Sequence, residues 1–360
     1  MHAARLGVMF ALLYAFLLLA PNSLASAAEK KRGAYQGAMA TEYPAWFKDS
    51  FLNLRDDVTE AKAHNKRVML MFTQDNCPYC NALVERNLAQ KEIEQRLRER
   101  FDVIAMNVWG DREVIGLDGV RHTEKSLATS LKVQFTPTLL FFDEAGKMIL
   151  RLNGYISPPQ FKVALEYVAQ GKEKEISYRD YIAANSPPAS GGELFKEDFF
   201  KPAPYQLKRK PGAQARPLAV FFEQKDCPNC AELHQKVLSD PDTRAIIRKL
   251  DVIQLDMWSK TPLITPQGKR VTAREWARTL DVKYAPTMVL FDERGREIIR
   301  SEAFFKIFHT QGIFAYAAEG DYKTEPSFQR YLSARAEKLR EQGKDVDIWR
   351  MGDEVAGSKK

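Results

Sequence analysis

The sequence is poor in cysteine and in long apolar runs, and it has no large excess of one charge. Only four of its 360 residues are cysteines, and two closely spaced pairs use all four. Beyond the first 20 residues no stretch is long and apolar enough to span a bilayer. The 54 Lys and Arg are spread among 47 Asp and Glu, which disfavours a nucleic-acid partner. With 45% hydrophobic residues, the composition predicts a soluble globular protein of two domains.

The N-terminus has the features of a secretory signal. His2 and Arg5 give a short basic start, residues 6–20 form an apolar core, and residues 25–27 are an A-x-A cleavage site. The apolar core is too short for a comfortable transmembrane helix. We therefore expect residues 1–27 to be a signal peptide, with an uncleaved membrane anchor as the alternative. Export would place the cysteines in an oxidising compartment.

The first cysteine pair, Cys77 and Cys80, follows an apolar run at residues 68–72 that predicts a buried strand. A helical pattern begins directly after it, so the pair lies on a strand-to-helix turn. A helix N-terminus presents unpaired backbone N–H groups and a partial positive charge, which favour a thiolate. Cys77 is therefore predicted to be an exposed nucleophile of low pKa and Cys80 the resolving thiol. Tyr79, between them, is expected to border the exposed sulfur.

The same unit occurs a second time. Cys227 and Cys230 follow another apolar run, at residues 217–222. In both copies an X-Pro step precedes a later apolar strand, 60 positions after the first cysteine at Pro137 and 59 positions after it at Pro286. This internal repeat predicts two copies of one domain. A C-x-x-C pair closes too small a loop to restrain an unfolded chain much, so redox chemistry explains the spacing better.

The order of apolar and helical patterns in the first copy is strand, helix, strand, helix, strand, strand, helix. This order predicts an α/β fold in which a central mixed β-sheet is flanked by helices. We place the domains at residues 41–170 and 216–320, joined by a linker at 171–215. Residues 321–360 are expected to form a helical extension that packs on the second domain.

Together these cysteine pairs and later prolines resemble the thioredoxin superfamily in both halves of the chain. In that family the proline is cis and packs beside the active cysteines, and the backbone of the preceding residue pairs with an extended substrate strand. The resemblance implies that Thr136-Pro137 and Ala285-Pro286 are the cis-proline pairs and contact substrate. A cis bond is physically accessible at any X-Pro step. No cofactor is implied.

Residues 107–112, 135–138 and 151–155, together with the secretion signal, are similar to the SoxW-type periplasmic thioredoxins. That family is associated with sulfur-compound oxidation and with reduction by a membrane electron carrier of the CcdA/DsbD kind. The resemblance implies a periplasmic reductase of protein disulfides, linked to sulfur oxidation or cytochrome maturation. The second copy is a departure from the single-domain form of that family.

The buried aspartate of thioredoxin, which lies on the strand before the cysteines and helps proton transfer, has no counterpart here. Met71 takes that position in the first copy and Phe221 in the second. Proton transfer would then use water, the partner protein or, in the second copy, Glu223. The simpler interpretation of Glu223 is an exposed carboxylate.

Several functions remain open at this point. In thiol–disulfide exchange, the Cys77 thiolate attacks a substrate disulfide and Cys80 resolves the mixed disulfide, and the second pair repeats the reaction. Reductase, oxidase and isomerase all use this step, and the two pairs can in principle pass electrons to each other. Four thiolates also suit zinc, but the pairs lie 150 positions apart, so no metal site is expected. A redox-inactive binding module on the same fold is the other alternative.

Overall fold

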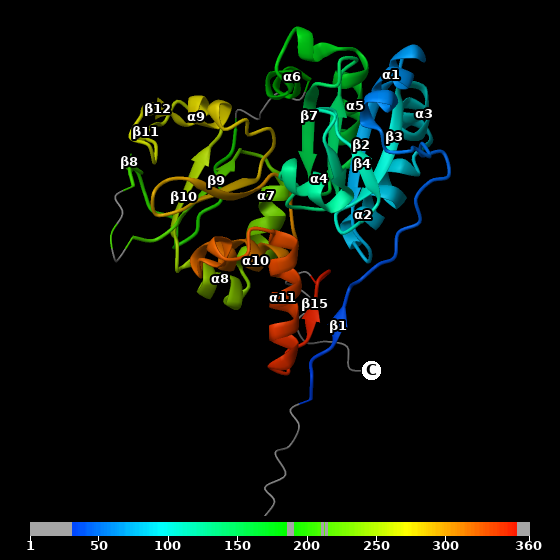
Figure 1. Ribbon diagram of the computed structural model, residues 1–360. Helices are drawn as coiled ribbons and strands as arrows, with labels where there is room; N and C mark the ends of the chain where they lie inside the picture. Colours follow the sequence, from blue (N-terminus) through cyan, green and yellow to red (C-terminus); the bar gives the residue numbers. More distant parts are fainter. Residues whose placement is uncertain (1–30, 186–190, 210–211, 213–214, 351–360) are drawn as a thin grey trace, which may run out of the picture.

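The computed structural model describes residues 31–185, 191–209, 212 and 215–350. The expected signal peptide at residues 1–27 lies outside these residues. Two α/β domains lie side by side, and the C-terminal helix lies below them in Figure 1. Within the described part, no helix has both the length and the apolar character needed to cross a membrane.

The first domain is built on a four-stranded sheet in the order β3-β2-β6-β7. Its strands are β2 (Arg67–Thr73), β3 (Phe101–Asn107), β6 (Thr138–Phe142) and β7 (Met148–Asn153). β2 and β3 are parallel, whereas β6 is antiparallel to both β2 and β7. Every residue of β2 and β6 is buried, because helices cover both faces of the sheet.

Two helices pack on each face of this sheet. α1 (Leu54–Ala63) and α4 (Glu124–Ser130) contribute to one apolar core, and α3 (Lys91–Arg100) and α5 (Pro158–Ala169) contribute to the other. Each helix buries an apolar stripe against the sheet, as amphipathic helices do, and α1 and α4 also bury one carboxylate each, Asp57 and Glu124. Two short strands form a hairpin before α4, namely β4 (Glu113–Ile115) and β5 (Arg121–Thr123).

The second domain repeats this plan with a sheet in the order β10-β9-β13-β14. Its strands are β9 (Leu218–Glu223), β10 (Asp251–Asp256), β13 (Thr287–Phe291) and β14 (Glu297–Ser301). The helices around it are α8 (Pro241–Ile247), α9 (Ala273–Thr279) and α10 (Ile307–Ala318). A smaller sheet holds β8 (Tyr205–Gln206), β11 (Pro262–Ile264) and β12 (Arg270–Thr272). The predicted α/β fold with two central mixed sheets flanked by helices is therefore confirmed.

The segment predicted as a linker contains regular structure. The 3-10 turn η2 (Lys172–Lys174) and helix α6 (Tyr178–Asn185) precede the undescribed residues 186–190, and β8 follows them. The Tyr178 hydroxyl forms a buried hydrogen bond with the hydroxyl of Tyr284 in the second domain. The helix therefore connects the two domains by packing as well as by sequence.

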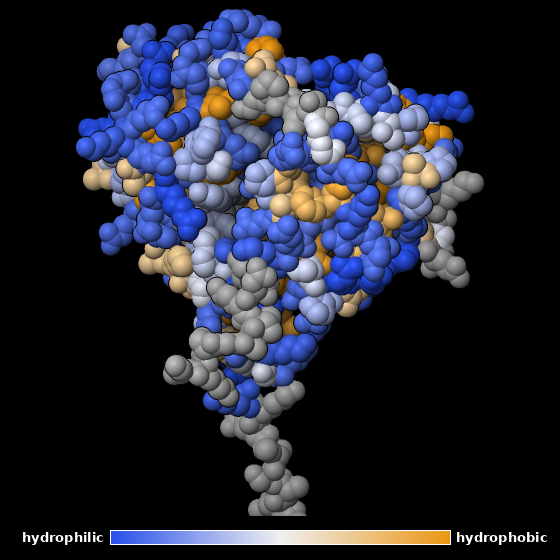
Figure 2. Space-filling model, turned by 180° about the vertical axis from the view of Figure 1, so that it is seen from behind, coloured by the Kyte–Doolittle hydropathy of each residue, from blue (hydrophilic) through white to orange (hydrophobic). Residues whose placement is uncertain are grey.

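The C-terminal part forms the turn η4 (Asp321–Lys323), helix α11 (Phe328–Glu341) and strand β15 (Val346–Asp347). Strand β15 pairs in parallel with β1 (Tyr35–Gln36), so the two ends of the described chain meet. The apolar face of α11 packs into the core of the second domain. Hydrophilic side chains cover most of the face seen in Figure 2, with apolar side chains in small separate groups.

Candidate active site

Both cysteine pairs lie where a central strand turns into a helix. After β2, α2 (Pro78–Leu83) begins with Cys77 as its N-cap, and after β9, α7 (Pro228–Glu232) begins with Cys227. A proline occupies the first helical turn in each case, where its missing N–H costs nothing. Each helix continues into a short π-helical segment, η1 (Val84–Leu88) or η3 (Leu233–Leu238). The strand-to-helix placement predicted for the cysteines is confirmed.

The sulfur of the first cysteine in each pair receives a backbone hydrogen bond. The N–H of Cys80 donates to Cys77 Sγ at 3.1 Å, and the N–H of Cys230 donates to Cys227 Sγ at 3.1 Å. Both pairs are closed as disulfides, with Cα–Cα distances of 5.3 and 5.1 Å. A donor at this position stabilises a thiolate when the disulfide opens, because the charge is met by an N–H and the helix N-terminus.

The prolines expected beside the cysteines are both cis. The peptide bonds Thr136-Pro137 and Ala285-Pro286 have the cis geometry, as does a third bond, Ala203-Pro204, which the sequence did not predict. In the first domain the loop touches the cysteine, since Cys77 Sγ lies 3.5 Å from Thr136 Oγ1 and 3.7 Å from the Thr136 carbonyl oxygen. Contact with substrate at these loops stays a prediction.

The exposure expected for the first site is wrong. Cys77 has a relative exposure of only 1%, and Pro78 and Tyr79 are buried as well. Cys77 and Tyr79 belong to the same apolar cluster as Phe305 and Phe328 of the second half of the chain, not to the cores around their own sheet. The sequence gives no sign of this, because the contacts join residues more than two hundred positions apart.

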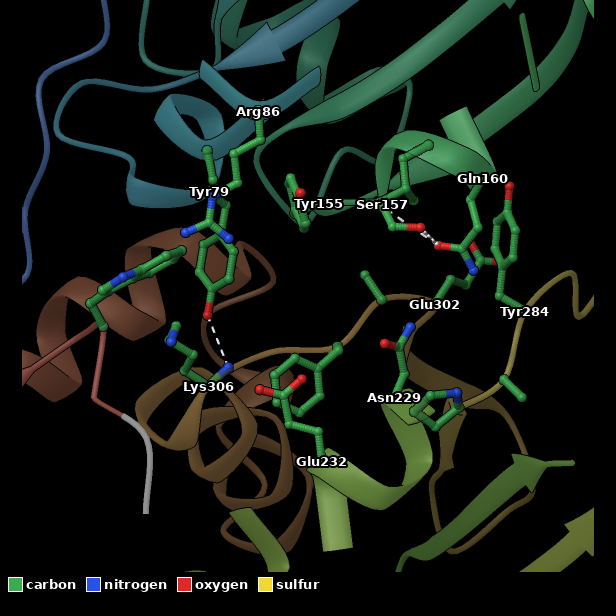
Figure 3. Close-up of a pocket in the computed structure, with 17 residues that line it drawn as sticks. Tyr79, Arg86, Tyr155, Ser157, Gln160, Asn229, Glu232, Tyr284, Glu302 and Lys306 are labelled. Atoms are coloured by element: carbon green, nitrogen blue, oxygen red, sulfur yellow. Dashed lines mark hydrogen bonds between the residues drawn. The ribbon is translucent and has the colours of Figure 1, made fainter. Parts of the chain in front are cut away.

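Tyr79 is held by the second half of the chain. Its hydroxyl accepts a hydrogen bond from the backbone N–H of Lys306 at 3.0 Å, as the dashed line in Figure 3 shows. Its ring lies edge-on to Phe305, His309 and Trp349, with centroids 5.2, 5.0 and 5.0 Å away. Burial raises the pKa of the Tyr79 phenol and lowers the pKa of His309 to about 4, so both are neutral at pH 7.

The second site is more open. Cys227 is 6% exposed, but Pro228 is exposed and Asn229 is half-buried, in contrast to the buried Pro78 and Tyr79. One side of this site faces a cavity of about 190 Å³ between the domains. In Figure 3, Asn229 and Glu232 of the second domain lie across this cavity from side chains of the first. The second-domain residues that line it include Ala285 and Pro286.

A buried polar cluster lies below the second site and was missed by the sequence analysis. Glu223, considered there as an exposed carboxylate, is 0% exposed. Its Oε1 lies 3.0 Å from Nε2 of His234, whose Nδ1 lies 3.0 Å from Glu197 Oε1. Gln254 donates to Glu223 Oε2 at 2.9 Å. His234 follows Cys230 by one helical turn, so this cluster is connected to the second cysteine helix.

The charge on this cluster is set by competing effects. Burial by itself lowers the pKa of His234, but hydrogen bonds and charges from Glu223 and Glu197 outweigh it, and the pKa is raised overall. A sequence signal existed in the difference between the copies, because Val84 and Thr73 occupy the positions that correspond to His234 and Glu223. No group of three or more His, Cys, Asp or Glu placed to hold a metal is found among the described residues.

Comparison with known proteins finds one family model and several solved structures that are similar to this chain. A family model described as a thioredoxin-like domain matches residues 54–169 and 204–308. No curated protein matches the chain. Among solved structures, a thioredoxin-fold protein from Helicobacter pylori is 26% identical, with a TM-score of 0.31, over 34% of this chain and 80% of that one.

Two further solved structures match at lower identity. A thioredoxin from Thermus thermophilus is 23% identical over 38% of this chain and 87% of its own, with a TM-score of 0.27. The C-terminal domain of DsbD from Neisseria meningitidis is 19% identical over 32% of this chain and 93% of its own, with a TM-score of 0.25. Because the family matches cover more than half of its length, this chain belongs to the thioredoxin-like family, with one such domain in each half.

Proposed function

We propose that the protein is a thiol–disulfide oxidoreductase that reduces disulfides at its two C-x-x-C sites. The observation that supports this most directly is the N–H to sulfur hydrogen bond at the start of each helix, 3.1 Å long at both Cys77 and Cys227. It stabilises the thiolate form, which is the nucleophile in disulfide exchange. A purely structural disulfide needs no such donor.

The reaction follows from the placement of the two sulfurs in each pair. In the reduced protein, the Cys227 thiolate attacks one sulfur of a substrate disulfide, which breaks the substrate S–S bond and forms a mixed disulfide. Cys230 then attacks Cys227 Sγ, closes the protein disulfide and releases the substrate as a dithiol. Two electrons and two protons pass to the substrate. Cys77 and Cys80 perform the same exchange in the first domain, with Thr136-Pro137 and Ala285-Pro286 as the adjoining binding loops.

The cellular setting is proposed from the sequence. The signal at residues 1–27 supports a periplasmic location, or a membrane-anchored one if the signal is retained. The SoxW-like segments around residues 107–112 and 151–155 support a membrane electron donor of the CcdA/DsbD type and a role in sulfur oxidation or cytochrome maturation. Protein disulfides are the proposed substrates.

The reduction potential of each pair tests the direction of this reaction. We would measure it on the mature protein against a glutathione buffer, with the other pair changed to serine. A potential near that of thioredoxin, about −270 mV, is the expected result for a reductase. A value near that of DsbA, about −120 mV, would indicate an oxidase instead. If neither pair exchanges with glutathione, the protein is a binding module and not an oxidoreductase.

A further inference from the structure

Three segments from the second half of the chain lie over the first cysteine pair. They are residues 305–309 at the start of α10, residues 326–333 at the start of α11, and residues 346–349 around β15, and we call them together the cover. Each segment contributes an aromatic or aliphatic side chain to the apolar cluster that contains Cys77 and Cys80. The cover therefore buries the first site under residues that lie outside the first domain.

The cover also occupies the backbone before the cis proline. The carbonyl oxygen of Gln134 accepts a hydrogen bond from Gln329 Nε2 at 2.9 Å, and its side-chain Oε1 accepts one from the N–H of Phe328 at 3.1 Å. The next residue, Phe135, stacks on Phe305 at a centroid distance of 5.0 Å and contacts the Phe328 ring at 5.3 Å. A polypeptide that paired with Gln134 or packed on Phe135 would have to displace these contacts.

A small cavity remains beside Cys77. It has a volume of about 220 Å³ and lies between Trp109 and Thr136 of the first domain and His309, Gln329 and Ile348 of the cover. A water molecule takes up about 30 Å³ of liquid, so the cavity holds a few waters or a small organic molecule. The cavity beside the second site has a similar volume, about 190 Å³, so the two sites differ in how deeply the residues around the sulfur atoms are covered and not in cavity volume.

Within the described part of the chain, no segment covers the corresponding positions of the second site to the same extent. Pro228 is exposed where Pro78 is buried, and Asn229 is half-buried where Tyr79 is 4% exposed. The two sites share the same strand-to-helix turn and the same hydrogen bond to sulfur. They differ in the exposure of the residues that flank the sulfur atoms.

We propose that the two sites take different partners, an inference that rests on the proposed exchange chemistry. The pair Cys227 and Cys230 exchanges with proteins, whereas Cys77 and Cys80 exchange only with small thiols and disulfides that enter the cavity. This narrows the proposed function, because protein disulfides then react at the second site and not at the first. A small dithiol that reduces the first pair supplies two electrons and two protons. The two sulfurs of the dithiol form a disulfide as the Cys77–Cys80 bond breaks, and both cysteines become thiols.

The test compares a small and a protein reductant on the oxidised protein. Each disulfide is followed alone, the first in a Cys227→Ser/Cys230→Ser variant and the second in a Cys77→Ser/Cys80→Ser variant, so that transfer between sites cannot contribute. The variants react with dithiothreitol or with reduced thioredoxin, are quenched with an alkylating reagent and are analysed by mass spectrometry of their peptides. The wild-type chain is run alongside.

We expect dithiothreitol to reduce both pairs, and reduced thioredoxin to reduce the second pair at least about tenfold faster than the first, because the first requires a rare opening of the cover. Equal rates with thioredoxin would overturn the proposal. So would a first pair that dithiothreitol leaves oxidised while it reduces the second. If neither reductant opens either pair, the proposed oxidoreductase function itself fails.

Loosening the cover tests its part in this selectivity. In the Cys227→Ser/Cys230→Ser background, Gln134→Ala/Gln329→Ala removes the side chains that join the start of α11 to the loop before Pro137. The rate with thioredoxin should rise several-fold while the rate with dithiothreitol stays constant. Gln342→Ala, at an exposed position just beyond α11, is the control. An unchanged rate with thioredoxin in the double variant would show that the cover does not exclude proteins.

Discussion

At the scale of single residues, the hydrogen bond of the Tyr79 hydroxyl most clearly joins the two halves of the chain. The hydroxyl accepts the backbone N–H of Lys306 at 3.0 Å in a buried environment. Tyr79→Phe removes this acceptor and keeps the ring contacts, so we expect a loss of about 1–2 kcal/mol in the free energy of unfolding. Urea denaturation measures it. Tyr181→Phe, at a partly exposed tyrosine, is the control, and an equal effect of both changes would contradict the assignment.

His234 makes stability depend on pH through its neighbours Glu223 and Glu197, which raise its pKa against the effect of burial. A raised pKa in the folded state contributes stability that is fully present below the unfolded value of about 6.5 and is lost as pH rises through the folded value. Glu223→Gln removes one source of the shift. It should therefore destabilise the protein more at about pH 6 than at about pH 9.

Urea unfolding of the wild type and of Glu223→Gln at the two pH values checks this prediction, and an NMR titration of His234 gives its pKa directly. Glu341→Gln, at an exposed residue at the end of α11, is the matched control and should show the same small effect at both pH values. A larger loss at the higher pH would mean that the pKa of His234 is lowered, contrary to the geometry.

At the scale of elements, helix α6 connects the domains through one buried arginine. Arg179 Nη2 donates to the Met257 carbonyl at 2.8 Å and Nη1 donates to the Arg274 carbonyl at 3.2 Å. Its guanidinium lies 4.6 Å from the centre of the Trp258 ring, and burial lowers its pKa. All three partners are in the second domain, so the helix holds that domain against the end of the first.

Removing this arginine should weaken the whole molecule. Arg179→Met removes the donor to the buried Met257 carbonyl and to the part-buried Arg274 carbonyl, and we expect a loss of about 2–4 kcal/mol in the free energy of unfolding. Lysine cannot present two donors in one plane, so Arg179→Lys should restore only part of it. Denaturation measures the free energy of unfolding of both Arg179 variants. The control is Arg98→Met, which removes an exposed arginine of α3. A loss no larger than in this control would show that Arg179 does not hold the second domain against α6.

Local sequence patterns predict the strands and helices around the cysteines well. The strand before each cysteine, the helix after it and the hairpin of β6 and β7 all follow from apolar periodicity and turn residues within short windows. Helix α6 was not predicted, because its buried face is short and its partners Met257 and Tyr284 lie far away in sequence. A segment that gains its order from distant contacts is read as a linker when only its own residues are considered.

On the scale of the whole molecule, the two domains share cores. Cys77, Tyr79 and Phe135 of the first domain lie in the apolar cluster of the second, and Tyr284 of the second lies in a cluster of the first. We therefore expect one cooperative unfolding transition, with equal calorimetric and van't Hoff enthalpies. Differential scanning calorimetry of the oxidised protein checks this. Two separate transitions would show that the shared clusters contribute little.

The sequence by itself determined the repeated α/β domain, the strand-to-helix position of all four cysteines and the loops at Pro137 and Pro286. These features depend on residue spacing within one domain, where the chain's periodicity and its proline and cysteine positions act locally. Only the tertiary structure decided that Cys77 is buried, that Glu223 meets His234 and that the second site stays more open. The burial of Cys77 depends on side chains from the other half of the chain, and the contact of Glu223 with His234 depends on how strand β9 packs against the helical segment that follows it. Apolar periodicity and turn residues do not record such contacts.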